Sequence, residues 1–215
     1  PVGVLYQAVG GTTCRAWSPQ RAFSGDPVVE KLLSDWNDRI KNWNAQWGSD
    51  PAADVNRPMV LYDAMIAPLQ PYAIQGVIWY QGESNAGRAY EHAQLFPFLI
   101  EQWRKEQGQG DFSFYWVQLA DFMAEKSAPG ESTWAELRET QTKTLRLPNT
   151  GQAVIIDIGE GRDIHPRNKY DVASRLVRWA LAKDYGMKFP YRSPEYQSMA
   201  VAGNKVTVTL DCFGS

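Results

Sequence analysis

The chain has 215 residues and a formal net charge of −2, with 44% hydrophobic and 21% charged residues. This composition is typical of a globular domain, and the length is sufficient for one well-packed core. The near-neutral charge gives no basic surface of the kind that nucleic-acid-binding proteins carry, so we expect no nucleic acid partner. No apolar run approaches the roughly 20 residues that a membrane-spanning helix needs, so we expect no membrane partner either.

Short apolar runs bounded by turn residues alternate along the chain with helical patterns. Residues 2–9 are predicted to form a buried strand that ends in a turn at 10–12, and a polar helix at 28–47 and a short helix at 61–69 follow. The later elements, in chain order, are strand 76–80, helix 89–106, strand 112–119, helix 133–145, strand 153–158 and helix 166–185. This alternation predicts an α/β fold in which a parallel sheet is covered by helices on both faces.

Beyond residue 190 the pattern changes. In residues 199–210, larger apolar residues alternate with other residues on both sides of a Gly-Asn pair. This pattern predicts a two-stranded hairpin. We expect one domain over 1–190, with a polar helical insertion at about 25–58, and the start of a truncated β-domain at 191–215. Because the chain has no initiator Met and begins in an apolar run, we expect it to be part of a longer polypeptide.

Polar and glycine-rich segments follow the predicted strands. Ligands of open α/β sheets bind outside the carboxyl ends of the strands, so these segments are expected to form the site. They are residues 10–11, 81–85, 118–122 and 159–165. The chain has only two histidines, and His165 lies in the last of these segments, whereas His92 lies within a predicted helix and is expected to pack.

Asp163 lies two residues before His165, and a carboxylate that accepts from one ring nitrogen frees the other nitrogen to act as a base. Asp163 can equally be the N-cap of the next helix, and Asp157 is a second candidate for the acid. Two separated histidines do not form a typical zinc site, and no phosphate-binding loop occurs, so we expect no metal and no cofactor. The two cysteines, Cys14 and Cys212, leave disulfide pairing open.

Asn85 follows a Gly-Glu-Ser turn. Its side-chain amide can donate to a developing oxyanion together with a backbone N–H of Gly10 or Gly11, although Asn85 can also be a helix N-cap. Ser84 lies in a Gly-Glu-Ser-Asn-Ala string that resembles a nucleophile elbow, but alanine replaces the final glycine.

Three stretches of the chain resemble the sialate O-acetylesterases, a branch of the Ser-Gly-Asn-His (SGNH) hydrolases. They are residues 59–86, with the string Trp-Tyr-Gln-Gly-Glu-Ser-Asn, residues 134–141, and residues 156–169. The resemblance implies a flavodoxin-like three-layer α/β/α sandwich and a secreted or periplasmic serine esterase. It implies a catalytic domain at 1–190 that removes acetyl groups from O-acetylated sialic acid or another glycan.

The same resemblance assigns roles to residues. His165 is implied as the general base, Asp163 as the orienting acid, and Asn85 with Gly11 or Gly10 as the oxyanion hole. Many SGNH relatives place the acid three residues before the histidine, where this chain has an arginine, so a Ser–His dyad stays open. The nucleophilic serine is implied in a Gly-Gln-Ser-Asn-Met-like segment upstream, so we expect the chain alone to be inactive. Candidate substrate-binding residues are Gln81, Glu83 and Arg138.

Three alternatives remain. The first is an esterase of the same fold that acts on acetylxylan or another polysaccharide. The second is a glycoside hydrolase that uses Glu83 and Asp163 as paired carboxylates. The third is a non-catalytic carbohydrate-binding module that uses some of the nine tryptophans, although each tryptophan is first expected to be part of the core. An acidic sugar would need a cation near the site, and the candidates are Arg15, Arg88, Arg162 and Arg167.

Overall fold

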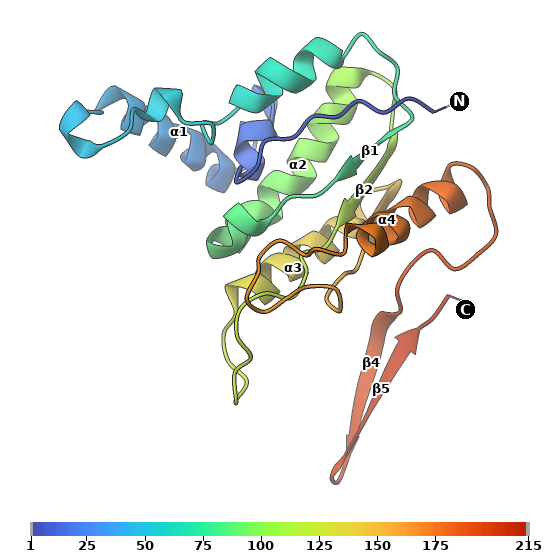
Figure 1. Ribbon diagram of the computed structural model, residues 1–215. Helices are drawn as coiled ribbons and strands as arrows, with labels where there is room; N and C mark the ends of the chain where they lie inside the picture. Colours follow the sequence, from blue (N-terminus) through green and yellow to red (C-terminus); the bar gives the residue numbers. More distant parts are fainter. Residues whose placement is uncertain (1, 214–215) are drawn as a thin grey trace.

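The structure, a computed structural model, describes residues 2–213, with the backbone alone described at Trp47. A central sheet has three parallel strands in the order β1-β2-β3 (Figure 1). The strands are β1 (Gly76–Trp79), β2 (Ser113–Val117) and β3 (Thr150–Ala153). The α-helices are α1 (Pro27–Lys41), α2 (Ala89–Gln107), α3 (Thr133–Lys143) and α4 (Lys169–Lys183). Short 3-10 segments are Cys14–Trp17, Gln20–Phe23, Ala45–Trp47, Pro51–Ala53, Ala67–Leu69, Glu83–Arg88 and Thr144–Arg146, with a π-helical turn at Tyr62–Ile66.

The middle strand, β2, is buried on both faces. Successive side chains of a strand point to opposite faces, so Phe114 and Trp116 pack into the cluster that contains α2, whereas Tyr115 and Val117 pack against α4. Helix α3 packs beside α2. The result is the predicted α/β/α sandwich, which is confirmed.

Tryptophans form much of the core. Of the eight whose side chains the structure describes, seven are buried, and only Trp43 is exposed. The Trp79 ring lies 6.1 Å from that of Trp17 and 5.8 Å from that of Trp103, both edge to face. This arrangement is the preferred one for aromatic rings, and the prediction that tryptophans build core is confirmed.

Local boundaries differ from the predictions in four places. The polar helix predicted at 28–47 ends at Lys41, and a separate 3-10 segment follows at Ala45–Trp47. Residues 2–8 are exposed and form no strand, so the predicted first strand is wrong: an apolar run becomes a strand only where another strand completes its hydrogen bonds. Strand β3 ends at Ala153, where the prediction had it begin, because its register is set by pairing with β2. Helix α4 begins at Lys169 rather than Pro166, because the Asn168 side chain accepts from the N–H of Asp171 at 3.1 Å and caps it.

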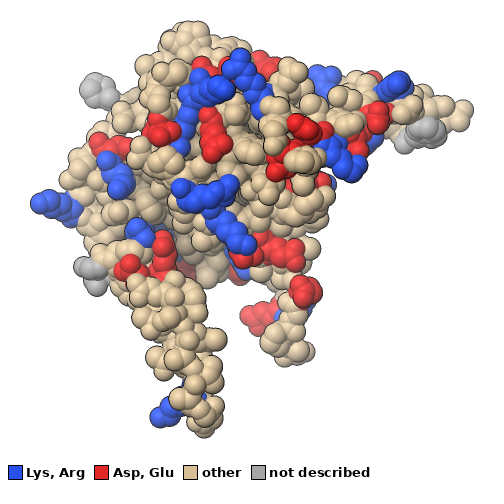
Figure 2. Space-filling view, turned by 180° about the vertical axis from the view of Figure 1, so that it is seen from behind, with Lys and Arg blue, Asp and Glu red and all other residues tan. Residues whose placement is uncertain are grey.

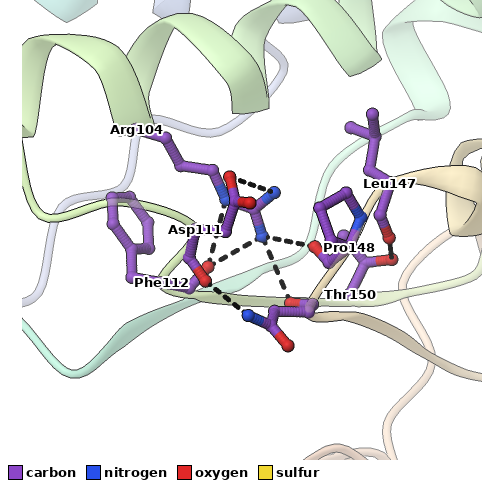
Figure 3. A network of polar contacts seen from close by, with 7 residues as sticks. Arg104, Asp111, Phe112, Leu147, Pro148 and Thr150 are labelled. Atoms are coloured by element: carbon purple, nitrogen blue, oxygen red, sulfur yellow. Dashed lines mark hydrogen bonds and ion pairs between the residues drawn. The ribbon is translucent and has the colours of Figure 1, made fainter.

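One buried arginine joins the amino ends of β2 and β3 (Figure 3). Nη2 of Arg104 donates to the carbonyl oxygens of Phe112 at 2.7 Å and Pro148 at 2.8 Å, while Nη1 lies 3.8 Å from Asp111. These contacts satisfy carbonyl groups that the sheet leaves unpaired at this edge. The polar loops that follow the strands begin at the opposite, carboxyl edge of the sheet.

A hairpin of β4 (Glu195–Ala202) and β5 (Lys205–Asp211) extends away from the sheet (Figure 1). Its two-residue Gly-Asn turn confirms the predicted hairpin. Figure 2 shows it as an almost uncharged arm, beside a main body on which positive and negative side chains are intermixed. No helix among residues 2–213 has the length and apolar character needed to cross a membrane.

Candidate active site

The segment after β1 turns sharply inward at Gly82. The φ angle of Gly82 is 154°, and a Cβ there would lie 3.0 Å from the Leu137 side chain and 3.2 Å from that of Gln141. Glycine therefore allows this turn to pack directly against α3. The following residues form the 3-10 segment Glu83–Arg88, and Asn85 within it is buried, with 4% of its surface exposed.

The side-chain amide of Asn85 has a fixed orientation. Its Oδ1 accepts from the backbone N–H of Cys14 at 3.0 Å and from Nε2 of Gln81 at 2.7 Å. Because a backbone N–H can only donate, the atom that faces it must be the oxygen. The other atom, Nδ2, donates no hydrogen bond within the part of the chain that the structure describes. A donor held ready in this way can stabilise an oxyanion.

The Gly10–Thr13 turn lies against Asn85. Its Thr12 carbonyl accepts from Nε2 of Gln81 at 3.1 Å, and Oδ1 of Asn56 accepts from the Thr13 N–H at 2.7 Å. Gly11 has a φ angle of 72°, in the left-handed region that favours glycine. Within residues 2–213, neither Gly10 nor Gly11 donates its backbone N–H to a hydrogen bond, so both groups are available to a ligand.

His165 lies on the loop after β3 and projects into solvent, with 85% of its side chain exposed. Its backbone N–H donates to Oδ1 of Asp163 at 2.9 Å, and its Nδ1 lies 3.7 Å from the same oxygen. That second distance is too long for a hydrogen bond. The His165 N–H and the Arg167 guanidinium, 3.6 Å from Oδ2, lower the pKa of Asp163, so this carboxylate is ionised at neutral pH.

A small hydrophobic cluster joins the two halves of the site. Ala86, which follows Asn85, belongs to a cluster with Leu119 and Trp134, and Ile164, which precedes His165, packs against it. The loops after β1, β2 and β3 therefore meet at one edge of the sheet, as the parallel topology predicts.

Other residues singled out from the sequence have partners of their own. Asp157 forms a two-fold ion pair with Arg175, at 2.6 and 2.7 Å, which lowers the pKa of Asp157 and directs its carboxylate to α4 rather than to His165. Ser84 uses its carbonyl to accept from Arg88 at 3.1 Å, and its hydroxyl makes no hydrogen bond within residues 2–213.

The candidate substrate-binding residues fall at the same edge. Gln81 follows β1 and is buried, Glu83 begins the next 3-10 segment, and Arg138 of α3 donates to the Ala120 carbonyl at 3.3 Å. Burial lowers the pKa of Arg138. Substrate-binding roles for Glu83 and Arg138 stay predictions.

The candidate cations differ in how they are held. Arg15 lies 4.6 Å from the centre of the Trp36 ring and donates from Nε to the Asn56 carbonyl at 2.9 Å, so it packs. Arg88 pairs with Glu91, 3.3 Å away, and Arg167 with Asp163.

Two residues whose roles the sequence did not predict hold the site together. Buried Gln141 accepts the Leu119 N–H at 3.0 Å and donates to the Gln81 carbonyl at 3.3 Å, which joins the ends of β1 and β2. Asn56 fixes the Gly10–Thr13 turn from a loop 43 residues away. Gln141 lies in a stretch that carries the family resemblance, whereas a lone asparagine in a loop gives no signal.

Two further titratable groups, His92 and Cys14, are buried. His92 packs in the core, as expected, and burial lowers its pKa to about 3. Burial raises the pKa of the Cys14 thiol to about 12, so this thiol is inert as a nucleophile at neutral pH. Within the described residues, no three His, Cys, Asp or Glu side chains gather as a metal site would require.

Residues 1–169 match the family described as carbohydrate esterase, sialic acid-specific acetylesterase. The chain belongs to this family. The sialate O-acetylesterases of Mus musculus and Homo sapiens are each 35% identical to it, over 87% and 98% of this chain. The chain spans 40% and 41% of the length of these two relatives.

The chain is also similar, over almost its whole length, to a solved structure of a carbohydrate acetylesterase from Xanthomonas citri. It is 39% identical, with a TM-score of 0.76, and the match covers 96% of this chain and 42% of that chain. The predicted family and fold are thereby confirmed.

Proposed function

We propose that this chain is part of a carbohydrate O-acetylesterase that removes acetyl groups from O-acetylated sialic acid. The observation that carries the proposal is the orientation of Asn85, whose Oδ1 is held by Cys14 and Gln81 while Nδ2 is left to donate. Membership of the acetylesterase family and the names of the curated relatives support the reaction and the substrate class.

In the proposed mechanism, a serine hydroxyl attacks the acetyl carbonyl carbon while His165 accepts the hydroxyl proton. Asn85 Nδ2 and the N–H of Gly11, or of Gly10, stabilise the oxyanion of the tetrahedral intermediate. The C–O bond to the sugar then breaks, and His165 returns the proton to the sugar oxygen. Water, deprotonated by His165, attacks the acyl-enzyme, and acetate and the free serine hydroxyl are released.

Asp163 is proposed to orient the His165 ring. In this mechanism the 3.7 Å separation of Nδ1 and Oδ1 shortens to a hydrogen bond when substrate binds. Catalytic hydrogen bonds are often long before substrate binds and shorten in the complex. The lowered pKa of Asp163 keeps it anionic, as a partner of a developing imidazolium must be.

The nucleophile is proposed to come from a segment upstream of residue 1. The proposal is supported by the family resemblance, which implies a nucleophile in a Gly-Gln-Ser-Asn-Met-like segment, and no such string occurs in residues 1–215. No serine hydroxyl within residues 2–213 makes a hydrogen bond to the His165 ring.

The test uses the complete polypeptide and follows acetate release from O-acetylated sialic acid. His165→Ala is expected to lower kcat by at least about 10³-fold, since it removes the general base. Lys188→Ala, an exposed position outside the site, is the matched control and should leave the rate unchanged. A rate near wild type for His165→Ala would refute the assignment.

Labelling with a fluorophosphonate followed by peptide mapping locates the nucleophile. An adduct on a serine upstream of residue 1 is expected. An adduct on Ser84 would overturn the proposed source of the nucleophile. Glycosidic cleavage that survives the labelling would instead favour the paired carboxylates Glu83 and Asp163.

A second candidate function is deacetylation of a polysaccharide such as acetylxylan. The observation that favours it is the 39% identical relative from Xanthomonas citri, which is described as a carbohydrate acetylesterase without mention of sialic acid. Release of acetate from acetylated xylan, but not from O-acetylated sialic acid, would establish this alternative.

A further inference from the structure

Gln81 occupies a junction between two segments that the proposed mechanism requires. It lies two residues after the end of β1 and is 8% exposed. Its Nε2 lies 3.1 Å from the Thr12 carbonyl oxygen and 2.7 Å from Oδ1 of Asn85. One amide nitrogen thus contacts both the turn that carries the backbone donors and the side chain that supplies the amide donor.

The orientation of the Gln81 amide follows from backbone groups alone. The Cys14 N–H identifies the Asn85 atom that faces it as an oxygen, and an oxygen can accept only from the nitrogen of Gln81. The Thr12 carbonyl requires the same nitrogen. Both hydrogens of Nε2 are therefore used, and none is left for a substrate.

The other end of the Gln81 amide makes no hydrogen bond that would hold the residue in place. Oε1 is enclosed and has no hydrogen-bond partner within the described residues. The hydrogen bonds described for this side chain are the two that Nε2 donates, to the Thr12 carbonyl and to Oδ1 of Asn85. An apolar residue at this position would leave the Thr12 carbonyl without this donor, so the residue contributes through what its nitrogen holds in place.

We infer that Gln81 is a positioning residue of the oxyanion hole. Its side chain fixes Asn85 Nδ2 and the Gly10–Thr13 turn in one geometry. This inference rests on the proposed function. Without Gln81, the Asn85 amide keeps only its bond to Cys14 and can pivot about it. A donor displaced by about 1 Å can lower the rate by about 10²-fold, because oxyanion stabilisation depends on the donor's position in the transition state.

The test is made on the complete esterase with 4-nitrophenyl acetate, a probe that is independent of the sugar. Gln81→Met, of similar volume, is expected to lower kcat by about 10- to 100-fold while KM changes by less than about threefold. Gln152→Met is the matched control, since Gln152 is also a buried glutamine but bonds to Trp116 and Thr142 instead. It should keep kcat near wild type even if its melting temperature falls.

A double-mutant cycle separates positioning from other roles. In an Asn85→Ala background, Gln81→Met should cost little more, about threefold at most, because the donor that it positions is already gone. Losses that multiply, or a change confined to KM, would overturn the inference. If Asn85→Ala itself keeps the full rate, the proposed oxyanion hole fails; if only Gln81→Met keeps it, the inference alone fails.

Discussion

His92 makes the stability of the fold depend on pH. Its ring stacks on Phe96, with ring centres 5.1 Å apart, and its Nδ1 lies 2.8 Å from Oγ1 of Thr140. Because the Thr140 hydroxyl donates to the Leu137 carbonyl, it accepts from the histidine, whose Nδ1 therefore carries a proton. Nε2 is buried and has no hydrogen-bond partner among the residues described, and burial lowers the pKa of His92 to about 3.

The size of the effect follows from the two pKa values. In the unfolded chain a histidine titrates near 6.5, so below that pH the unfolded state binds a proton that the folded state does not. The free energy of unfolding therefore falls by about 1.4 kcal/mol per pH unit between about 6.5 and 3, and the loss reaches about 3 kcal/mol at about pH 4.5. This stability is present above the unfolded pKa and is lost on acidification.

The assay is urea unfolding, followed by tryptophan fluorescence, of the wild type and of His92→Asn between about pH 7 and 4.5. Asparagine keeps an N–H near the position of Nδ1 but does not titrate. Other groups titrate alike in both proteins, so the wild type should lose about 3 kcal/mol relative to the variant over this range. A difference that stays constant with pH would show that His92 is not held neutral in the fold.

Two further substitutions test the packing. Gly151→Ala should lower the free energy of unfolding by about 1–3 kcal/mol or more, since its Cβ would lie 2.3 Å from the Trp179 ring. Gly87 has open space around it, so Gly87→Ala is the control and should have little effect. Thermal melts of both variants make the comparison. Ser132→Ala should lower the free energy of unfolding by about 1 kcal/mol, because Ser132 Oγ caps α3 by accepting from the Ala135 N–H at 3.2 Å. Aspartate is also a good N-cap, so a Ser132→Asp variant that is equally destabilised would contradict this role.

The sequence predicted the helices and the central sheet because their patterns are local. Strand β2 is a continuous run of apolar residues, and α2 has a clear buried face. Strand β3 was misplaced because its residues, Thr150–Ala153, are mostly small or polar, and Gly151 is there to admit the Trp179 ring. Such a contact between distant elements leaves no periodic signal in the sequence.

For the candidate site, the sequence predicted where residues lie but not how their side chains are oriented. The parallel topology was enough to bring Asn85 and His165 to one edge of the sheet, whereas Gly11 lies there through the contacts of Gln81 and Asn56 with its turn. The orientation of the Asn85 amide was not predictable, because it depends on the N–H of Cys14, 71 residues away. The ion pair between Asp157 and Arg175 was not predictable either. It directs Asp157 to α4 and so distinguishes it from Asp163, the other candidate acid.

The two halves of the site differ in how firmly the fold holds them. Asn85 is buried and its amide oxygen is hydrogen-bonded twice, whereas the His165 side chain is exposed on the loop after β3. Substitutions around His165 can therefore accumulate during evolution without disturbing the core, while those around Asn85 cannot. On the proposed function, the His165 side of the site can change at little cost to folding, whereas a change on the Asn85 side also disturbs the core.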